Sequence, residues 1–301
     1  MKNCLFLFIG LLICASSFSQ SKNAYEQSVN DWHDYRIEYL KKPTGWLNLE
    51  GLFWLHKGKN TFGQAQGSDC RYINTSPADV YFPSHLGDFI YEGDSVVWVS
   101  NEKDIVKVND QIVAPKGSAL VYNDKIGGIK IDYKQYSWNI IKREDKVGIR
   151  FRNLKAKDLL TFKDVDRFPI DSQWRFKAVL VQPVQDFLMI TNVLGQTTPT
   201  KNAGKLVFTV QNQQYTLDVI DEGGKQLFIV FADLTSGKTT YGAGRFIDIQ
   251  KPDANGNTVI DFNLAYNPPC AFTPFATCPL PPVQNRLPFE IPVGEKNYGH
   301  H

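Results

Sequence analysis

The chain has 301 residues, a formal net charge of +2 and 21% charged residues. This length is sufficient for one large β domain or two smaller ones with a buried core. The near-neutral charge and the lack of a run of basic residues exclude an electrostatic basis for binding nucleic acid or an anionic membrane surface.

The first 19 residues have the pattern of a secretory signal peptide. A lysine precedes the apolar run of residues 5–13, and the small residues Ser17 and Ser19 follow it. This pattern predicts cleavage before Gln20 and export to the periplasm or medium. The apolar run is too short for a bilayer core of about 30 Å, so no transmembrane segment is expected in the mature chain. The alternative is a lipid anchor on Cys14, which the bulky residue before it disfavours.

An N-terminal helix and lead-in are expected over residues 20–44. Tyr25, Val29 and Trp32 recur at helical spacing, which predicts an amphipathic helix over residues 23–40 that ends before Pro43.

A first β unit is expected over residues 45–145. Short apolar runs cut by turn residues predict strands at residues 51–55, 95–99, 105–108 and 138–141. Asn109-Asp110 and residues 57–60 are typical of tight hairpin connections. The motifs at residues 58–63 and 108–112 loosely resemble the forkhead-associated β-sandwich. Its Arg and Ser-x-x-His recognition residues are missing here, so this resemblance implies only a fold and no phosphothreonine binding.

A second β unit is expected over residues 146–301. The same pattern predicts strands at residues 146–151, 177–181, 205–210, 215–219 and 227–231, with turns at residues 222–225 and 255–256. Residues 153–173 have no strong period and predict a long connection near a boundary between units. The predicted fold class is therefore all-β, with mainly antiparallel sandwich-like or barrel-like sheets.

The last stretch differs from the rest, because half of the 16 prolines lie between Asn267 and Pro292. Neither a helix nor a central strand can run through such a sequence. It also contains Phe272, Leu280 and Leu287, and a disordered tail would carry fewer apolar groups. We therefore expect an ordered, proline-rich segment that wraps over the sheet.

Several motifs in the second half closely resemble the bacterial domain-of-unknown-function family 1684. They are the runs at residues 241–246, 261–263, 265–272, 277–282 and 285–288. The resemblance extends back through residues 191–195 to residues 45–47 and 51–55, which is nearly the whole mature chain. The resemblance implies no established activity, cofactor or catalytic residue.

Cys270 and Cys278 are a disulfide candidate, because seven residues separate them in a compartment that permits disulfides. The alternatives are a metal site, two buried free thiols, or a nucleophilic cysteine with His56 or His85 as its base. A metal site is disfavoured because the next histidines in sequence are His300 and His301. Cys70 is expected to be a core residue.

The ligand-binding candidates are polar residues of the motifs that carry the family resemblance: Tyr241, Arg245, Asn267, Asn285 and Arg286. Two guanidinium groups flanked by amides would suit a carboxylate or phosphate ligand. The alternative, which we favour, is that both arginines hold the proline-rich segment through backbone carbonyls and Asp261 or Glu290.

Other polar patterns favour structure over chemistry. Residues 242–244 lack the Lys and Ser/Thr of a phosphate loop. Residues 253–261 alternate Asp and Asn like a calcium loop, but Gly256 breaks the register and indicates a hairpin. Asp164, Asp166 and Asp171 could include an acid/base pair, although a solvated loop is the simpler interpretation. The tryptophans at positions 46, 54, 98, 138 and 174 are more typical of cores than of a sugar-stacking platform.

Two functions stay open at this stage. The first is a non-catalytic ligand-binding or scaffold protein of the cell envelope, since no nucleophile elbow, metalloprotease helix or dinucleotide fingerprint is present. The second is an envelope hydrolase that acts on an acidic or sugar-containing substrate near Arg245, Asn267 and Arg286. The expected partner is a small molecule or an envelope component, and no cofactor, metal or nucleic acid is expected.

Overall fold

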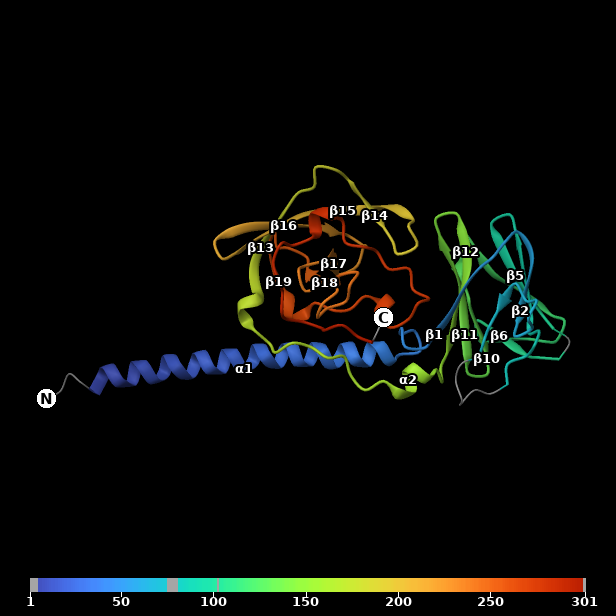
Figure 1. Cartoon of the computed structure of the whole chain (residues 1–301), viewed down its shortest axis with the longest axis horizontal. Coiled ribbons are helices and arrows are strands. Elements are labelled where there is room, and N and C mark those ends of the chain that lie inside the picture. Colours follow the sequence, from blue (N-terminus) through green and yellow to red (C-terminus); the bar gives the residue numbers. More distant parts are fainter. Residues whose placement is uncertain (1–4, 75–80, 102, 300–301) are drawn as a thin grey trace. The chain divides into compact units, whose positions relative to one another are not determined.

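The computed structural model describes residues 5–74, 81–101 and 103–299, with side chains from Asn23 onward. These residues form three sheets whose strands pair almost entirely antiparallel, so the predicted all-β class is confirmed (Figure 1). The described residues do not include residues 1–4 of the predicted signal peptide or the terminal histidines His300 and His301. They also do not include the side chain of Cys14, the alternative lipidation site. Within the described part of the chain, no helix combines the length and apolarity needed to cross a bilayer.

The chain divides into two compact units. We call Leu40–Lys163 with Phe272–Ala276 the N-terminal β unit. The C-terminal β unit consists of the preceding helix to Tyr39, Asp164–Ala271 and the residues from Thr277 onward. The division falls inside the long connection expected at residues 153–173. The first β unit was expected to end at residue 145. The division comes later, because the strands on either side of residue 145 pair with each other in one hairpin.

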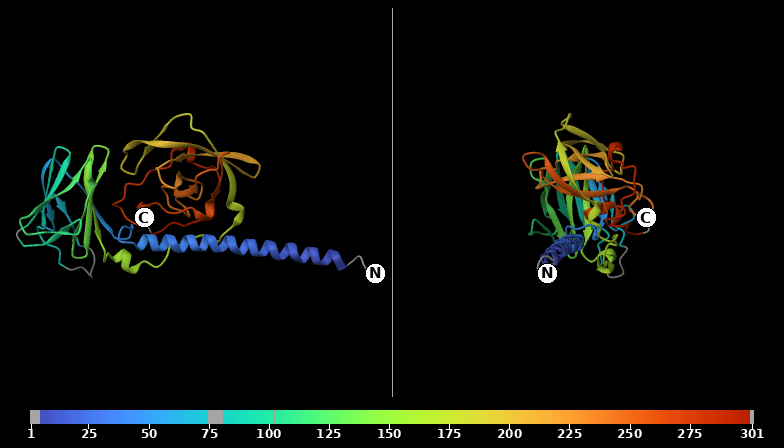
Figure 2. Two further views of the ribbon diagram at one scale, coloured as in Figure 1. Left: turned by 180° about the vertical axis from the view of Figure 1, so that it is seen from behind. Right: turned by 90° about the vertical axis from the view of Figure 1, so that its left-hand side faces the viewer.

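Helix α1 spans Leu5–Lys41 and ends before Pro43, as predicted. The helix begins before residue 23, where the sequence predicted its start, because the leucine-rich leader is itself a good helix former. The C-terminal part of α1 packs on the C-terminal β unit through Trp32, whose ring centroid lies 6.1 Å from that of Tyr266. The left view of Figure 2 shows this part of the blue helix running below the red C-terminal segment.

The N-terminal β unit is a sandwich of two sheets. In spatial order the first contains β1 (Leu49–Trp54), β12 (Lys146–Asn153), β11 (Tyr136–Arg143), β10 (Lys130–Tyr133), β6 (Val106–Val108) and β7 (Gln111–Val113). The second contains β3 (Cys70–Arg71), β2 (Gly58–Gly63), β4 (Gly87–Glu92), β5 (Ser95–Ser100), β8 (Ser118–Asn123) and β9 (Gly127–Gly128). The ring of Phe62 in the second sheet lies 5.3 Å from Trp138 in the first, so both sheets contribute to one core. The short helix α2 (Lys157–Thr161) follows β12.

One predicted hairpin of this unit is confirmed and one is wrong. Asn109 and Asp110 have φ of 49° and 63° between the paired strands β6 and β7, as a tight hairpin requires. The connection at residues 57–60 does not close a hairpin, because β1 and β2 lie in different sheets. Here the chain leaves one layer of the sandwich and enters the other.

The C-terminal β unit is built on one curved seven-stranded sheet. Its path runs β18 (Arg245–Gln250), β17 (Gln226–Phe231), β16 (Gln213–Ile220), β15 (Thr197–Val210), β13 (Arg175–Val181) and β19 (Asn257–Asp261), and β14 (Phe187–Thr191) pairs with β15. Single 3-10 turns are η1 (Ser172–Trp174), η2 (Phe262–Leu264), η3 (Pro269–Ala271) and η4 (Val283–Asn285).

The proline-rich segment is ordered and packed, as predicted. Leu287, Ile291 and Val293 are at most 4% exposed and belong to the core of the C-terminal β unit. Its middle, Phe272–Ala276, belongs instead to the N-terminal β unit, where the Thr273 hydroxyl donates to the Leu49 carbonyl at 2.9 Å. The segment therefore contributes residues to both units.

Candidate functional site

Arg245 begins β18 and points into the protein. The turn before it closes with a hydrogen bond from Gly244 N–H to the Tyr241 carbonyl at 3.0 Å. Gly244 has φ of 91°, and a Cβ there would collide with the Phe231 carbonyl oxygen, so only glycine fits. This turn brings the Arg245 side chain inward, where it is 0% exposed.

The buried guanidinium of Arg245 is bonded to protein groups. It donates to Asp233 Oδ2 at 2.8 Å, to the Ile291 carbonyl at 2.9 Å and to the Val293 carbonyl. Burial lowers the pKa of Arg245, and the Asp233 carboxylate opposes that shift. Among the described residues its Nε has no hydrogen-bond partner, and that atom is buried as well. Arg245 thus fixes the C-terminal segment to the sheet. Its carboxylate partner is Asp233, whereas Asp261 or Glu290 was expected.

Like Arg245, the side chains of Asn285 and Asn267 are buried and bonded to protein groups. The Asn285 amide donates to the carbonyls of Asp218 and Val230, both at 2.9 Å, and its Oδ1 accepts from Asp218 N–H at 2.7 Å. The Asn267 amide donates to Glu295 Oε2 at 3.0 Å and to the Lys296 carbonyl at 2.7 Å. A proline-rich segment lacks an internal hydrogen-bond ladder, so these side chains supply the bonds that fix it.

Tyr241 and Arg286 are the predicted ligand residues that reach the surface. Arg286 is exposed, whereas Tyr241 is half-buried. Burial raises the pKa of Tyr241, and the nearby thiols of Cys270 and Cys278 raise it further. Because Arg245 is enclosed and Arg286 is exposed, the two guanidinium groups do not present a joint anion site.

Cys270 and Cys278 lie together and are thiols in this structure. The Cys270 backbone N–H donates to the Cys278 sulfur at 3.0 Å. A hydrogen bond from the Cys278 side chain lowers the pKa of the Cys270 thiol, and partial burial opposes this. The disulfide stays a prediction, which this proximity permits. Cys70 is 0% exposed, so its predicted place in a core is confirmed.

The histidines proposed as thiol bases bond carboxylates of the N-terminal β unit. His56 Nε2 lies 3.4 Å from Asp69 Oδ1, and His85 Nε2 lies 2.8 Å from Asp88 Oδ1. Each of these histidines therefore has a neighbouring carboxylate as its partner within the N-terminal β unit.

The acidic loop residues have structural contacts. Asp164 bonds His33 at 2.9 Å, and Asp171 caps η1. Asp253 accepts the N–H groups of Asn255 and Asn257, as expected for a turn and not for a calcium loop. Across the described residues, no group of three or more His, Cys, Asp or Glu side chains could hold a metal ion.

The tryptophans contribute mainly to cores. Trp98 and Trp138 are at most 1% exposed in the N-terminal β unit. Trp174 packs against Phe262 and Phe289 in the C-terminal β unit. These three rings do not form an exposed sugar platform.

A cavity of about 570 Å³ opens on the C-terminal β unit, where the sequence predicted no site. Its lining comes from β13, β14, β15, β17 and the adjoining turns: Leu180, Gln182, Pro183, Asp186, Phe187, Lys201, Asn202, Ala203, Asp221, Leu227, Lys251 and Pro252. The volume is in the range typical of small-molecule sites. No short motif could have revealed it, because the curvature of the sheet brings these separate segments together.

A family model described as "Protein of unknown function (DUF1684)" matches residues 160–296. This match supports the assignment of the chain to the DUF1684 family. The matched DUF1684 segment contains all five predicted ligand residues, both clustered cysteines and the whole cavity lining. The resembling motifs at residues 45–55 lie outside it.

Two solved structures are similar to parts of the chain. One is the solution NMR structure of an uncharacterized protein of Haloarcula marismortui, 25% identical, with 48% of this chain and 82% of that chain covered and a TM-score of 0.40. The other is Rad53 1–466 in complex with AMP-PNP, 12% identical, with 75% and 50% covered and a TM-score of 0.18. No curated protein matches the chain.

Proposed function

We propose that this DUF1684 protein is exported and binds a small ligand of the cell envelope without transforming it. Export is supported by the leader pattern of residues 1–19, with Ser17 and Ser19 at the cleavage site. Binding is supported by one observation above all, the open cavity of about 570 Å³ in the C-terminal β unit.

The alternative hydrolase receives no support from Arg245 and Asn267, two of the three residues that suggested it. Arg245 and Asn267 are 0% exposed and bond the C-terminal segment. A group that assists hydrolysis must come within hydrogen-bond reach of the substrate, which neither side chain can do from this position.

A ligand screen on the mature protein, residues 20–301, tests the binding proposal. The expected result is that at least one envelope-type metabolite raises the melting temperature in proportion to its concentration, because a ligand that binds only the folded state stabilises it. The variant Ala203→Phe fills the cavity and should abolish this shift. Ala24→Phe, at an exposed position of α1, is the control and should leave the shift unchanged.

Circular dichroism and an unfolding curve establish that both variants fold. If a ligand stabilises wild type and folded Ala203→Phe equally, the site lies elsewhere. If a broad screen yields no stabilising compound, the binding proposal fails.

A further inference from the structure

The cavity has an apolar side that continues onto the surface. Leu180, Phe187 and Leu227 line it, and Phe187 is 55% exposed. The loop between β13 and β14, which stands out from the sheet in Figure 1, carries the fully exposed Val184. On the outer face of β14, Met189 is 62% exposed. Contiguous exposed apolar groups on a folded chain commonly mark a binding surface.

The cavity also has a cationic side. Lys201 Nζ lies 3.2 Å from Asp221 Oδ2, and Lys251 Nζ lies 3.8 Å from the other oxygen of the same carboxylate. Two ammonium groups, each with three donors, therefore share one carboxylate, and the two lysine side chains are 67% and 47% exposed. Asp186 also lines the cavity and makes the formal sum of its charges zero. Recognition of an anion would thus depend on the local pair of lysines and not on net charge.

The apolar and cationic sides are adjacent because of strand register. Phe187 of β14 is paired with Lys201 of β15, so the two side chains leave the same face of the sheet. A ligand with an apolar body and an anionic group could contact the aromatic ring and the ammonium group together.

We propose that this cavity binds an amphipathic anion, with an apolar chain against Phe187 and a carboxylate or phosphate group on Lys201 and Lys251. The inference rests on the proposed ligand-binding function and names the chemical class of the ligand. A free fatty carboxylate and a lipid phosphate share this chemistry.

Calorimetric titration of the mature protein with four ten-carbon probes below their micellar concentrations tests the ligand class. The probes are decanoate, decyl phosphate, decanol and decyltrimethylammonium. Decanoate and decyl phosphate should bind with one-to-one stoichiometry, at least about 10-fold more tightly than the neutral or cationic probe. The stronger of the two anions indicates whether a carboxylate or a phosphate head is preferred.

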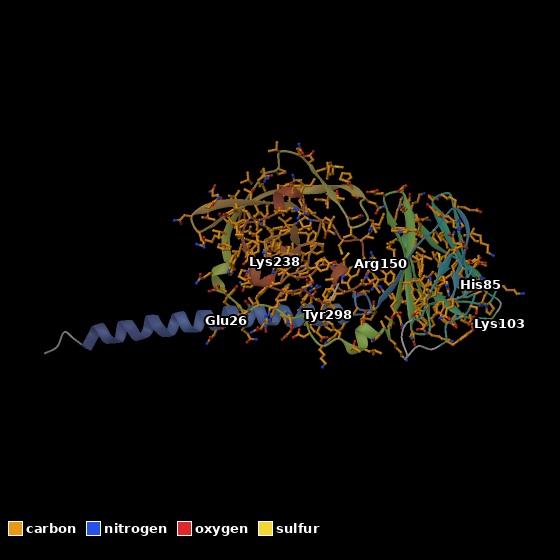
Figure 3. The ribbon with its side chains drawn as sticks, viewed as in Figure 1. Glu26, His85, Lys103, Arg150, Lys238 and Tyr298 are labelled. Atoms are coloured by element: carbon orange, nitrogen blue, oxygen red, sulfur yellow. The ribbon has the colours of Figure 1, made fainter. Side chains whose placement is uncertain are left out.

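Variants test the two sides of the site separately. Lys201→Gln and Lys251→Gln should each weaken the anions about 3- to 10-fold and leave decanol unchanged, since each removes one charged donor. Lys238→Gln is the matched control, because Lys238 (labelled in Figure 3) has the same 67% exposure as Lys201 and pairs with Glu290 at 3.6 Å outside the cavity.

Phe187→Ser should weaken every ten-carbon probe, because it removes apolar contact area. Leu160→Ser is its control, since Leu160 is 59% exposed in the N-terminal β unit and should not affect any probe. Equal unfolding midpoints for each variant and its control exclude a folding defect as the cause of weaker binding.

The outcomes separate this inference from the proposed function. If decanol or the cationic probe binds as tightly as decanoate, or if both lysine variants bind decanoate like wild type, the anion inference is overturned while ligand binding stands. If a screened compound of another class occupies the cavity and no anion does, the inference is also overturned. If neither these probes nor any screened compound binds, both proposals fail.

Discussion

Replacing Arg245 with methionine removes the guanidinium that joins β18 to the C-terminal segment. Both side chains of the Arg245–Asp233 pair are 0% exposed, so the variant leaves a carboxylate buried without its counter-charge. It also leaves the carbonyls of Ile291 and Val293 without their donors. Breaking a buried ion pair by removing one partner costs about 3–5 kcal/mol of unfolding free energy. For a unit of this size that corresponds to a fall in melting temperature of roughly 10 °C.

Urea denaturation of wild type and Arg245→Met measures the change in unfolding free energy, and amide hydrogen exchange locates it. Exchange should increase first at the backbone of residues 287–295, which the guanidinium fixes. Arg175→Met is the matched control: its ion pair with Asp261 spans 3.7 Å and Arg175 is 51% exposed, so the expected loss is below about 1 kcal/mol. A loss below about 1 kcal/mol for Arg245→Met, with unchanged protection of residues 287–295, would refute the structural role.

Three further predictions concern other polar contacts. Tyr25→Phe removes the hydroxyl that bonds a β19 carboxylate at 2.9 Å, so urea unfolding should show a loss of about 1–2 kcal/mol. In the reduced protein, Cys278→Ala should slow iodoacetamide alkylation of Cys270, because it removes the hydrogen bond that lowers the Cys270 pKa; an unchanged rate contradicts this. Hydrogen bonds from Thr61 lower the pKa of Asp69 from 3.8 to about 2. The folded pKa lies below the unfolded one, so this stabilisation is present above pH 4 and is lost toward pH 2. Between pH 4.5 and 2, unfolding free energy should fall more steeply in wild type than in Asp69→Asn, and equal slopes would contradict the assignment.

Local features were predicted well from the sequence. The end of α1 before Pro43 follows from the geometry of proline, and the Asn109-Asp110 hairpin follows from the tolerance of these residues for positive φ. A short apolar run bounded by turn residues located β5. Alternating apolar residues located β16, because side chains alternate between the two faces of a sheet. Each of these signals depends on residues that are close in the chain.

Strand pairing and the roles of the polar residues could not be obtained in this way. A turn signal at Gly58 predicts a reversal of the chain, yet it does not say whether the next strand joins the same sheet or the facing one. The motif around Arg245 allowed either a ligand or a structural partner. Its enclosure by Ile291 and Val293, more than 40 residues later in the chain, decides for the structural role.

The sequence by itself determined the β class, the position of nine of the nineteen described strands, the end of the first helix and the packing of the proline-rich segment. Backbone preference and apolar periodicity act over a few residues, so one chain is enough to detect them. The tertiary structure alone decided which polar side chains are enclosed and that Lys201, Lys251 and Phe187 line one cavity. Such groupings depend on sheet curvature and on contacts between distant segments, which no local pattern records.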